Sequence, residues 1–251
     1  MKLLTLIISI LLWFTFSLLA EISPELKSKA EQGNSEAKAQ LGFKYYFGEG
    51  VSQDYEQAAK LFRTAAEQGH ADAQLKLGFM YAEGKGVPQD YEEAVKWYRK
   101  AAEQGHAQAQ AHLGIMYADG EGVPQGYEQA AKWLRKAAKQ GHAEAQALLG
   151  LMYFHGKGVP QDSEQAAKWH RKAAEQGITT AQALLGTMYY LGKGVPQDIE
   201  QAYAWITLAA VQDKNYVKEH DALLAEMTPE QISEGQRLAQ ELHEKIKARE
   251  E

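Results

Sequence analysis

The sequence predicts an all-α protein, an α/α solenoid of five 36-residue helix–turn–helix repeats with capping helices at both ends. Three observations support this fold class. A Leu-Gly pair recurs with a period of 36 residues, segments with helical apolar spacing alternate with glycine- and proline-containing breaks, and no segment alternates with the period of a strand. The composition, 45% apolar and 24% charged over 251 residues, is that of a folded protein.

Two motifs that occur once in each repeat show the period directly. The Leu-Gly pair stands at Leu41-Gly42, Leu77-Gly78, Leu113-Gly114, Leu149-Gly150 and Leu185-Gly186. A tyrosine follows with the same step, at Tyr45, Tyr81, Tyr117, Tyr153 and Tyr189. We call such a set of equivalent positions a column. Because the members of a column share one place in a repeated structure, their side chains can be compared along the chain.

The second repeat shows why each unit is expected to form two helices. Asp72–Glu83 has helical apolar spacing, and Gly84–Gln89 interrupts it, because its glycines favour positive φ and its proline cannot continue a helix. Asp90 is placed to cap the next helix by accepting from its free amides. That helix is expected to end near Gln104, with Gly105 as its C-terminal cap.

Both ends of the repeat array depart from the pattern, as terminal units of a stacked array do. Residues 21–36 are expected to form an N-terminal half-repeat cap, with a short helix that opens at Ser23-Pro24. The five repeats then occupy residues 37–213.

Residues 214–251 are expected to form C-terminal capping helices. Thr228 is placed as the N-cap of the last helix, and Gln231 stands at the capping-box position. The charged stretch Glu241–Glu251 is expected to face solvent.

The first twenty residues have the pattern of a targeting segment. Lys2 supplies a positive charge, Leu3–Leu19 contains no charged residue, and Ala20 is a small residue at the expected cut, which is typical of a signal peptide over residues 1–20. Leu18 at the −3 position and the length of the apolar run leave an uncleaved N-terminal anchor as the alternative. Both interpretations predict a periplasmic or secreted protein, with membrane contact only if the segment stays uncleaved.

Charge and cysteine content exclude several classes of function. The formal net charge of −6 gives no indication of nucleic-acid binding. The chain contains no cysteine, which excludes disulfides, thiolate catalysis and cysteine-based zinc sites.

Three histidines, His70, His106 and His142, share one column and raise the question of a metal site. Equivalent positions in stacked helices lie roughly 8–10 Å apart, whereas zinc binds nitrogen at about 2 Å. Ile178 also fills the fourth position of the column. We therefore predict turn residues here, with no metal and no cofactor.

The remaining motifs predict no catalysis. The five Gly-x-Gly pairs follow no strand and precede no Lys-Ser/Thr, so they indicate turns and not a phosphate loop. A nucleophile elbow, a catalytic acid pair and a His-Glu-x₂-His motif are all missing from the sequence. The sequence therefore predicts a protein that is not an enzyme.

Basic residues also recur by repeat, at Lys60, Lys96, Lys132 and Lys168 and at Arg63, Arg99, Arg135 and Arg171. A glutamate precedes each lysine by four residues, the favourable order for helix ion pairs, and three of the arginines have a glutamate four residues later. We therefore expect a neutralised solvent-facing surface and not a basic ridge.

The unit resembles the Sel1-like repeat, a relative of the tetratricopeptide repeat. The resemblance rests on Ala-x₃-Leu-Gly-x₂-Tyr, Gly-x-Gly-Val-Pro-Gln-Asp and Ala-x₂-Trp-x₃-Ala-Ala-x₂-Gly, found in the second repeat at 73–81, 84–90 and 94–105. It implies a right-handed solenoid whose first helices line a concave groove. Gly126 replaces the capping aspartate in the third repeat. Some secreted relatives carry a disulfide in each repeat, so proposals for that subgroup transfer poorly to this cysteine-free chain.

Four columns of the first helices vary strongly among the repeats, whereas the core columns of Ala37, Leu41, Gly42 and Tyr45 barely vary. Because equivalent positions need the same core but not the same surface, we expect the variable columns to face the groove and bind a partner. The predicted partner-binding residues are Phe43, Tyr46, Phe47, Lys76, Phe79, Glu83, His112, Asp119, Leu148, Phe154, His155, Leu184, Tyr190 and Leu191. Exposure is expected above all for Phe47, His155 and Leu191, which stand at helix ends.

The functional prediction is a non-catalytic protein–protein interaction scaffold or adaptor of the bacterial envelope, which binds a protein or peptide in the concave groove. The resemblance implies a regulatory, host-interaction or immunity role. One alternative is an enzyme that acts on the cell wall or on a β-lactam, which would need a catalytic serine or carboxylate pair in the groove. Another is a glycan-binding module, whose binding would weaken on addition of salt.

Overall fold

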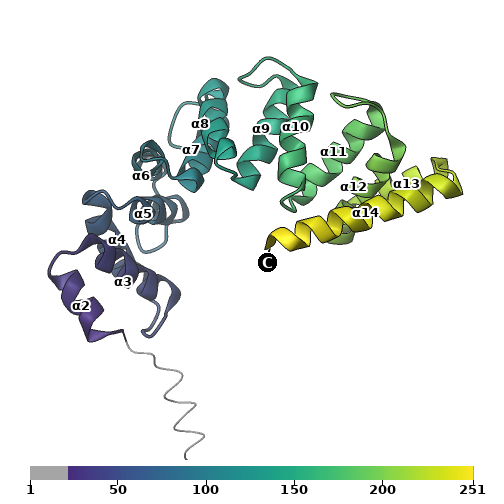
Figure 1. The fold of residues 1–251 in the computed structure, drawn as a ribbon. Helices are drawn as coiled ribbons and strands as arrows, with labels where there is room; N and C mark the ends of the chain where they lie inside the picture. Colours follow the sequence, from purple (N-terminus) through teal and green to yellow (C-terminus); the bar gives the residue numbers. More distant parts are fainter. Residues whose placement is uncertain (1–21, 251) are drawn as a thin grey trace, which may run out of the picture. The chain divides into compact units, whose positions relative to one another are not determined.

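The computed structural model describes residues 22–250, and every regular element within this range is a helix (Figure 1). The predicted leader, residues 1–20, lies outside the described residues. No helix in the described range combines the length and the hydropathy that a membrane span requires.

The described chain divides into two compact units, residues 22–109 with 121–124 and residues 110–120 with 125–250. The first unit contains α2 (Pro24–Glu31), α3 (Ser35–Phe47), α4 (Tyr55–Glu67), α5 (Ala71–Glu83) and α6 (Tyr91–Glu103). Helix α7 (Ala107–Asp119) begins in the first unit and continues into the second. The second unit further contains α8 (Tyr127–Lys139), α9 (Ala143–His155), α10 (Ser163–Ala174), α11 (Thr179–Leu191), α12 (Ile199–Gln212), the 3₁₀ helix η1 (Lys214–Tyr216), α13 (Val217–Glu226) and α14 (Pro229–Glu250).

Capping residues define the helix ends where the sequence predicts them. The Asp90 side chain accepts a hydrogen bond of 2.9 Å from the amide of Glu93 at the start of α6. Gly84 ends α5 with a φ of 66°. At the start of α8, Gly126 stands at the N-cap and makes no side-chain hydrogen bond. The N-cap side chains and the C-terminal glycines explain why each helix begins and ends at these residues.

The histidine column caps the first helices of the repeats. Nδ1 of His70 accepts from the amide of Ala73 at 3.3 Å, and its Nε2 lies 2.8 Å from a carboxylate oxygen of Glu36. His142 caps α9 in the same way. Within residues 22–250, no group of three or more His, Cys, Asp or Glu residues is arranged to hold a metal ion.

Glycines allow close packing both within and between repeats. Gly78 of α5 is buried, and a β-carbon there would lie 2.8 Å from the Tyr98 ring of α6. In the following loop Gly86 has a φ of 68°, and a β-carbon would lie 2.2 Å from the carbonyl oxygen of Tyr55 in the preceding repeat. Two separate constraints therefore require glycine at position 86: the positive φ, and the close approach of the Tyr55 backbone, which leaves no room for a side chain.

A ladder of glutamines links the repeats inside each unit. The Gln146 amide donates 3.0 Å to the carbonyl of Ala138, and the Gln176 amide donates 2.7 Å to the side-chain oxygen of Gln146. The same glutamine pairs form between Gln104 and Gln74 and between Gln212 and Gln182. The ladder was not predicted from the sequence, although its signal is a column with a buried glutamine in four of the five repeats and Lys38 in the first.

The recurrent arginines bind the tyrosine column of the next repeat. Arg135 donates to the Tyr153 hydroxyl at 3.0 Å, and Arg171 donates to that of Tyr189 at 2.5 Å. The four recurrent lysines are exposed, as predicted for a solvent-facing surface, but none of them forms an ion pair with the glutamate four residues earlier among the described residues. Lys96, for example, contacts Glu93 one turn away at 2.7 Å, and not Glu92.

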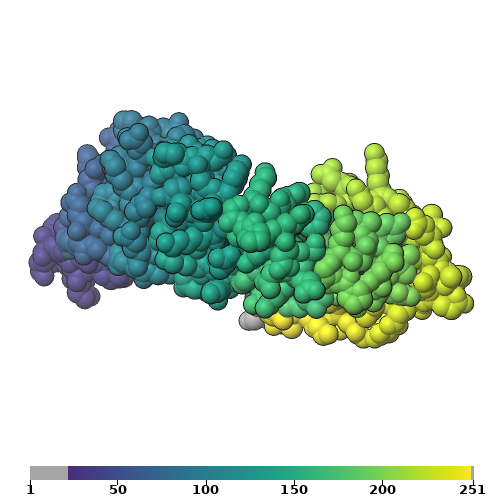
Figure 2. Space-filling view, turned by 90° about the horizontal axis from the view of Figure 1, so that it is seen from above, coloured from purple at the N-terminus to yellow at the C-terminus, as the bar shows by residue number. Residues whose placement is uncertain are grey.

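The C-terminal helices pack against α12. Helix α14 begins with the predicted capping box, in which the Gln231 amide donates 3.3 Å to the Thr228 hydroxyl and the Thr228 amide donates 3.0 Å to the Gln231 side chain. The charged side chains of its end are exposed over residues 241–249, as predicted, whereas Leu242 and Ile246 pack against the core of the last repeats. Figure 2 shows α14, in yellow, along the green repeats of the second unit.

Candidate functional site

The predicted partner-binding residues fall in both units, and each unit brings part of the set together. Phe43, Tyr46, Phe47, Lys76, Phe79 and Glu83 belong to the first unit. His112, Asp119, Leu148, Phe154, His155, Leu184, Tyr190 and Leu191 belong to the second. All of these residues lie on the first helices of the repeats, in columns that neighbour the buried leucine and glycine columns.

In the first unit, four aromatic rings surround the ammonium group of Lys76. We call Phe43, Tyr46, Phe47, Lys76 and Phe79 the aromatic–lysine cluster. The distances from Lys76 Nζ to the ring centres are 4.7 Å for Tyr46, 5.4 Å for Phe79, 5.6 Å for Phe47 and 5.7 Å for Phe43. All lie within the range of about 6 Å at which a cation is attracted to an aromatic face.

The cluster presents some rings to solvent and buries others. Phe47, at the end of α3, is 55% exposed, as the sequence predicts for this helix-end position. The expectation for Tyr46 needs correction, because only 7% of it is exposed. Its ring packs edge-on against Phe47 and Tyr55, with centroid distances of 5.0 and 5.1 Å. Tyr46 therefore supports the cluster and does not offer a contact surface.

Two lysines converge on the ring of Phe79. Lys85 Nζ lies 5.1 Å and Lys76 Nζ 5.4 Å from the centre of this ring. Partial burial and the charge of Lys85 lower the pKa of Lys76. Among the described residues, neither lysine forms an ion pair with a carboxylate. The cluster and the adjoining Lys85 thus hold positive charge that no ion pair of the first unit neutralises.

In the second unit, residues of α7, α8 and α9 line an open hollow of about 600 Å³, which we call the α7–α9 hollow. Its apolar lining residues are Ile115, Ala118, Leu134, Leu148, Leu151 and Met152. Its polar lining residues are Asp119, Gln125, Tyr127, His155 and Lys157. Three of the predicted residues, Asp119, Leu148 and His155, therefore line one hollow.

Comparison of equivalent columns explains why the hollow exists. At the positions two repeats earlier, the first unit has Phe43, Tyr46 and Phe47 in place of Ile115, Ala118 and Asp119. The aromatic rings fill this space in the first unit, where Phe43 packs 4.9 Å from Phe62 and stacks 6.3 Å from Phe47. The smaller side chains of α7 leave it open.

Part of the hollow comes from outside the first helices and was not predicted from the sequence. The Gln125 amide donates 2.7 Å to the carbonyl of Ala118 and 3.1 Å to the hydroxyl of Tyr127, which places both side chains at the rim. Lys157 Nζ lies 5.4 Å from the centre of the Tyr127 ring. The loop glutamine column was visible in the sequence, but its hydrogen bond back to the first helix was not.

The remaining predicted residues lie near the ends of the first helices or are partly covered. The ring of Phe154 lies 5.1 Å from the ring of His155, which is exposed. The ammonium group of Lys193 lies 5.8 Å from the centre of the Phe154 ring. Leu191 is 50% exposed, and the Tyr190 hydroxyl donates 2.9 Å to Glu226, which raises the pKa of Tyr190. Glu83 is exposed, and His112 and Leu184 are half-buried. Their role in binding stays a prediction.

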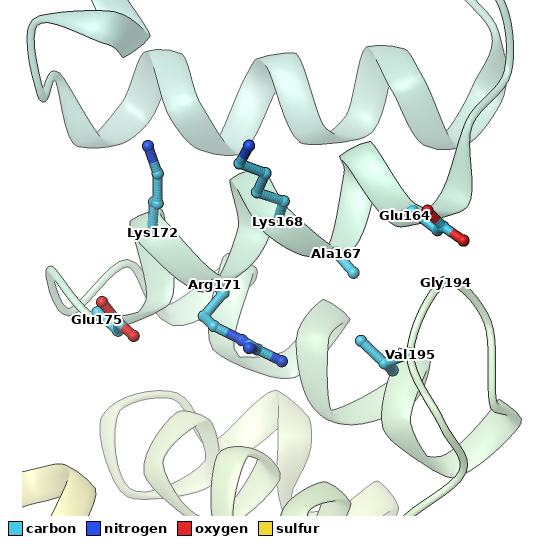
Figure 3. A pocket seen from close by; sticks show the side chains of 8 residues that line it. All are labelled: Glu164, Ala167, Lys168, Arg171, Lys172, Glu175, Gly194 and Val195. Atoms are coloured by element: carbon cyan, nitrogen blue, oxygen red, sulfur yellow. The ribbon is translucent and has the colours of Figure 1, made fainter.

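A second hollow, of about 370 Å³, lies beside α10 and is lined mainly by charged side chains. Lys168 and Lys172 point to one side of α10, and Arg171 extends toward the loop of Gly194 and Val195 (Figure 3). Three of its five charged side chains already have partners within the second unit: Arg171 binds Tyr189, Lys172 lies 4.8 Å from the Trp169 ring centre, and Glu175 pairs with Arg249 at 3.2 Å. These contacts stabilise the fold and favour the α7–α9 hollow as the binding site.

His170 is a buried titratable group outside both sites. It is fully buried, and neither ring nitrogen has a hydrogen-bond partner among the described residues. Its ring packs on α9, where a β-carbon on Gly150 would lie 2.8 Å from it. Burial lowers the pKa of His170 to about 4. The ring is therefore a neutral packing element at neutral pH.

The repeats match a known protein family. The Sel1 repeat matches residues 35–70, 71–106, 107–142, 143–178 and 179–213. The chain belongs to the Sel1 repeat family. No curated protein matches the chain.

Two solved structures are clearly similar. A Sel1 repeat protein from Oxalobacter formigenes is 40% identical, with a TM-score of 0.68 over 71% of this chain and 74% of that one. The protein c5321, a protective antigen present in uropathogenic Escherichia coli strains with an SLR fold, is 34% identical, with a TM-score of 0.60. That match covers 88% of this chain and 56% of the E. coli chain.

Membership in the Sel1 repeat family agrees with the geometry of both sites. Sel1 repeat proteins generally act as scaffolds for protein–protein interactions, and the repeat is typically non-catalytic. The aromatic–lysine cluster and the α7–α9 hollow combine apolar side chains with a few charged groups, the composition of a surface that recognises a partner.

Proposed function

We propose that this Sel1 repeat protein is a non-catalytic adaptor that binds a protein or peptide partner on the first helices of its repeats. The α7–α9 hollow is the main observation that supports this proposal. It is lined by six apolar side chains and bordered by polar ones. This combination suits an apolar anchor side chain of a partner, with polar groups that set its orientation.

The energetics favour a bulky anchor. Full burial of a leucine or phenylalanine side chain contributes roughly 1.5–3 kcal/mol. The floor side chains Leu148 and Leu151 are already half-buried, so a ligand covers them with little reordering of the chain. The Asp119 carboxylate and the Lys157 ammonium group at the rim provide charges of both signs that favour one orientation of a peptide.

The bacterial envelope is the proposed location. The signal-peptide pattern of residues 1–20 supports a periplasmic or secreted protein. The similarity to c5321, a protective antigen of uropathogenic E. coli, also supports this proposal. A regulatory, host-interaction or immunity role is compatible with an adaptor in this compartment.

The test fills the hollow with side chains that the chain itself uses at equivalent positions. Ala118→Tyr combined with Asp119→Phe recreates the Tyr46 and Phe47 pair of the first repeat. The control carries the same side chains on the exposed face of α8, as Gln129→Tyr with Lys132→Phe. Circular dichroism should show that all three proteins are equally helical.

Crosslinking and pull-down from envelope extract then compares the parent with both variants. We expect a protein that the parent and the α8 control capture and that the filled variant loses by at least about tenfold. Equal capture by the filled variant would place the partner elsewhere and contradict the proposal.

A further inference from the structure

The aromatic–lysine cluster and the adjoining Lys85 hold two positive charges whose placement the fold does not require. Helices are usually supported by ion pairs on their surfaces, and a like charge nearby costs free energy. Lys76 and Lys85 both approach the ring of Phe79, at 5.4 and 5.1 Å from its centre, with no carboxylate paired to either within the described residues. The charge of each lysine therefore repels that of the other, and no ion pair within the first unit offsets the repulsion.

The columns show that this arrangement is specific to one place in the chain. The column of Lys76 has glutamine, histidine or leucine in the other repeats, and the column of Phe47 has no other Phe, Tyr or Trp. Packing of the repeats therefore does not require a lysine or a phenylalanine here. The rings hold the ammonium group of Lys76 in place, since four ring centres lie within 5.7 Å of it.

The chemistry of the cluster selects its ligand. Two ammonium groups that approach the same ring, with no carboxylate paired to either, favour a ligand that brings a carboxylate to them. Phe47, which is 55% exposed beside them, offers an apolar surface for the neighbouring side chain of the same ligand. Glu49 and Glu83 are exposed, within two residues of Phe47 and Lys85 respectively, and they disfavour an extended polyanion.

We infer that the aromatic–lysine cluster binds an acidic side chain of a partner peptide, an aspartate or glutamate next to an aromatic or leucine residue. The carboxylate lies between Lys76 and Lys85, and the apolar neighbour packs on Phe47. This inference rests on the proposed function, because it specifies one sequence feature of the peptide that the first helices bind.

The test selects ligands from random sequences. A library of random 12-residue peptides displayed on phage is selected on the immobilised full chain. The same selection uses Lys76→Met with Lys85→Met, which removes both charges and keeps unbranched side chains against the rings. The matched control, Lys60→Met with Lys96→Met, removes two exposed lysines of α4 and α6. Thermal unfolding by circular dichroism checks that the variants keep the fold.

We expect the parent and the control to enrich peptides with Asp or Glu beside Phe, Trp or Leu. The Kd of the strongest such peptide, measured by fluorescence anisotropy, should weaken at least about tenfold in the double Met variant and stay unchanged in the control. Replacement of the peptide carboxylate by an amide should weaken binding to the parent to a similar extent.

Three results would overturn the inference. Enriched peptides could lack acidic residues, or the double Met variant could bind the same peptides as tightly as the parent. Heparin or vesicles with phosphatidylglycerol could also bind through these lysines more tightly than any selected peptide, which would assign the cluster to a polyanion or a membrane. If the filled α7–α9 variant loses the selected peptides while the double Met variant keeps them, the proposed function stands and this inference fails. If no peptide is enriched at all, both fail.

Discussion

His170 makes the stability of this protein depend on pH. The ring is fully buried without a hydrogen-bond partner among the described residues, and burial lowers its pKa from 6.5 to about 4. The unfolded chain therefore binds a proton at this histidine more readily than the native protein does. The contribution of neutral His170 is fully present above pH 6.5 and is lost as the pH falls toward 4.

The size of the effect follows from the pKa difference. One pKa unit corresponds to 1.36 kcal/mol, so the full shift amounts to about 3 kcal/mol, of which about 2 kcal/mol is lost by pH 5. The acidic residues whose pKa values are shifted, such as Glu36 and Glu230, have lowered pKa values and titrate below this window. The difference in slope between the parent and a variant without His170 therefore reports on this residue.

The perturbation is His170→Leu. Leucine is already present at the equivalent position of the preceding repeat, as Leu134. Two changes are expected. The variant should be more stable at pH 7.5 by about 1–3 kcal/mol, because a buried polar ring without hydrogen bonds is removed. Its stability should also fall by about 2 kcal/mol less than that of the parent between pH 7.5 and 5.

Urea denaturation followed by far-ultraviolet circular dichroism measures both quantities at pH 7.5, 6.5 and 5. The control is His243→Gln, since His243 is exposed on α14 and its replacement should leave the slope of the parent unchanged. Equal slopes for the parent and His170→Leu would refute the reasoning, because they would mean that His170 is hydrated or hydrogen-bonded in solution.

Two further predictions concern the links between repeats. Gly158→Ala should destabilise the second unit by about 3 kcal/mol, because φ is 68° and the added carbon would lie 2.1 Å from the Tyr127 carbonyl oxygen. Gly141→Ala, with a φ of 96° and no atom within 4 Å, should cost only about 1 kcal/mol, and equal melting temperatures of the two variants would contradict the packing argument. Gln146→Leu should cost about 1–3 kcal/mol, because it leaves the Ala138 carbonyl and the Gln176 amide without their partner. Urea denaturation measures this loss, and an unchanged midpoint would mean that water replaces the glutamine.

The first helices of the two units offer features of very different chemistry. The second unit has an open apolar hollow, and the first has rings around a lysine. Both sites occupy the same columns, so differences in side-chain volume and charge at equivalent positions are sufficient to create them. Variation on a constant repeat thus provides specificity without any change in the fold.

The candidate site was only partly predictable from the sequence. Exposure of Phe47 and Leu191 follows from their places at helix ends, and the variable columns led to Asp119, Leu148 and His155 of the hollow. The burial of Tyr46 was not predictable, because it depends on Phe47 and on Tyr55 of the next helix. Column comparison finds positions that differ, but not the space that their side chains leave between helices.

For the fold as well, some features follow from the sequence alone and others depend on packing. The sequence by itself determined the repeat period, the helices and their ends, because caps such as Asp90 and glycines such as Gly84 act through contacts within a few residues. Only the tertiary structure decided the partners of long side chains. Arg171 reaches Tyr189 of the next repeat, and not Glu175 one turn away, since its fixed donor geometry meets a hydroxyl that packing holds in place. The hollow on α7 and α9 and the rings around Lys76 arise in the same way, from the volumes of side chains that different helices bring together.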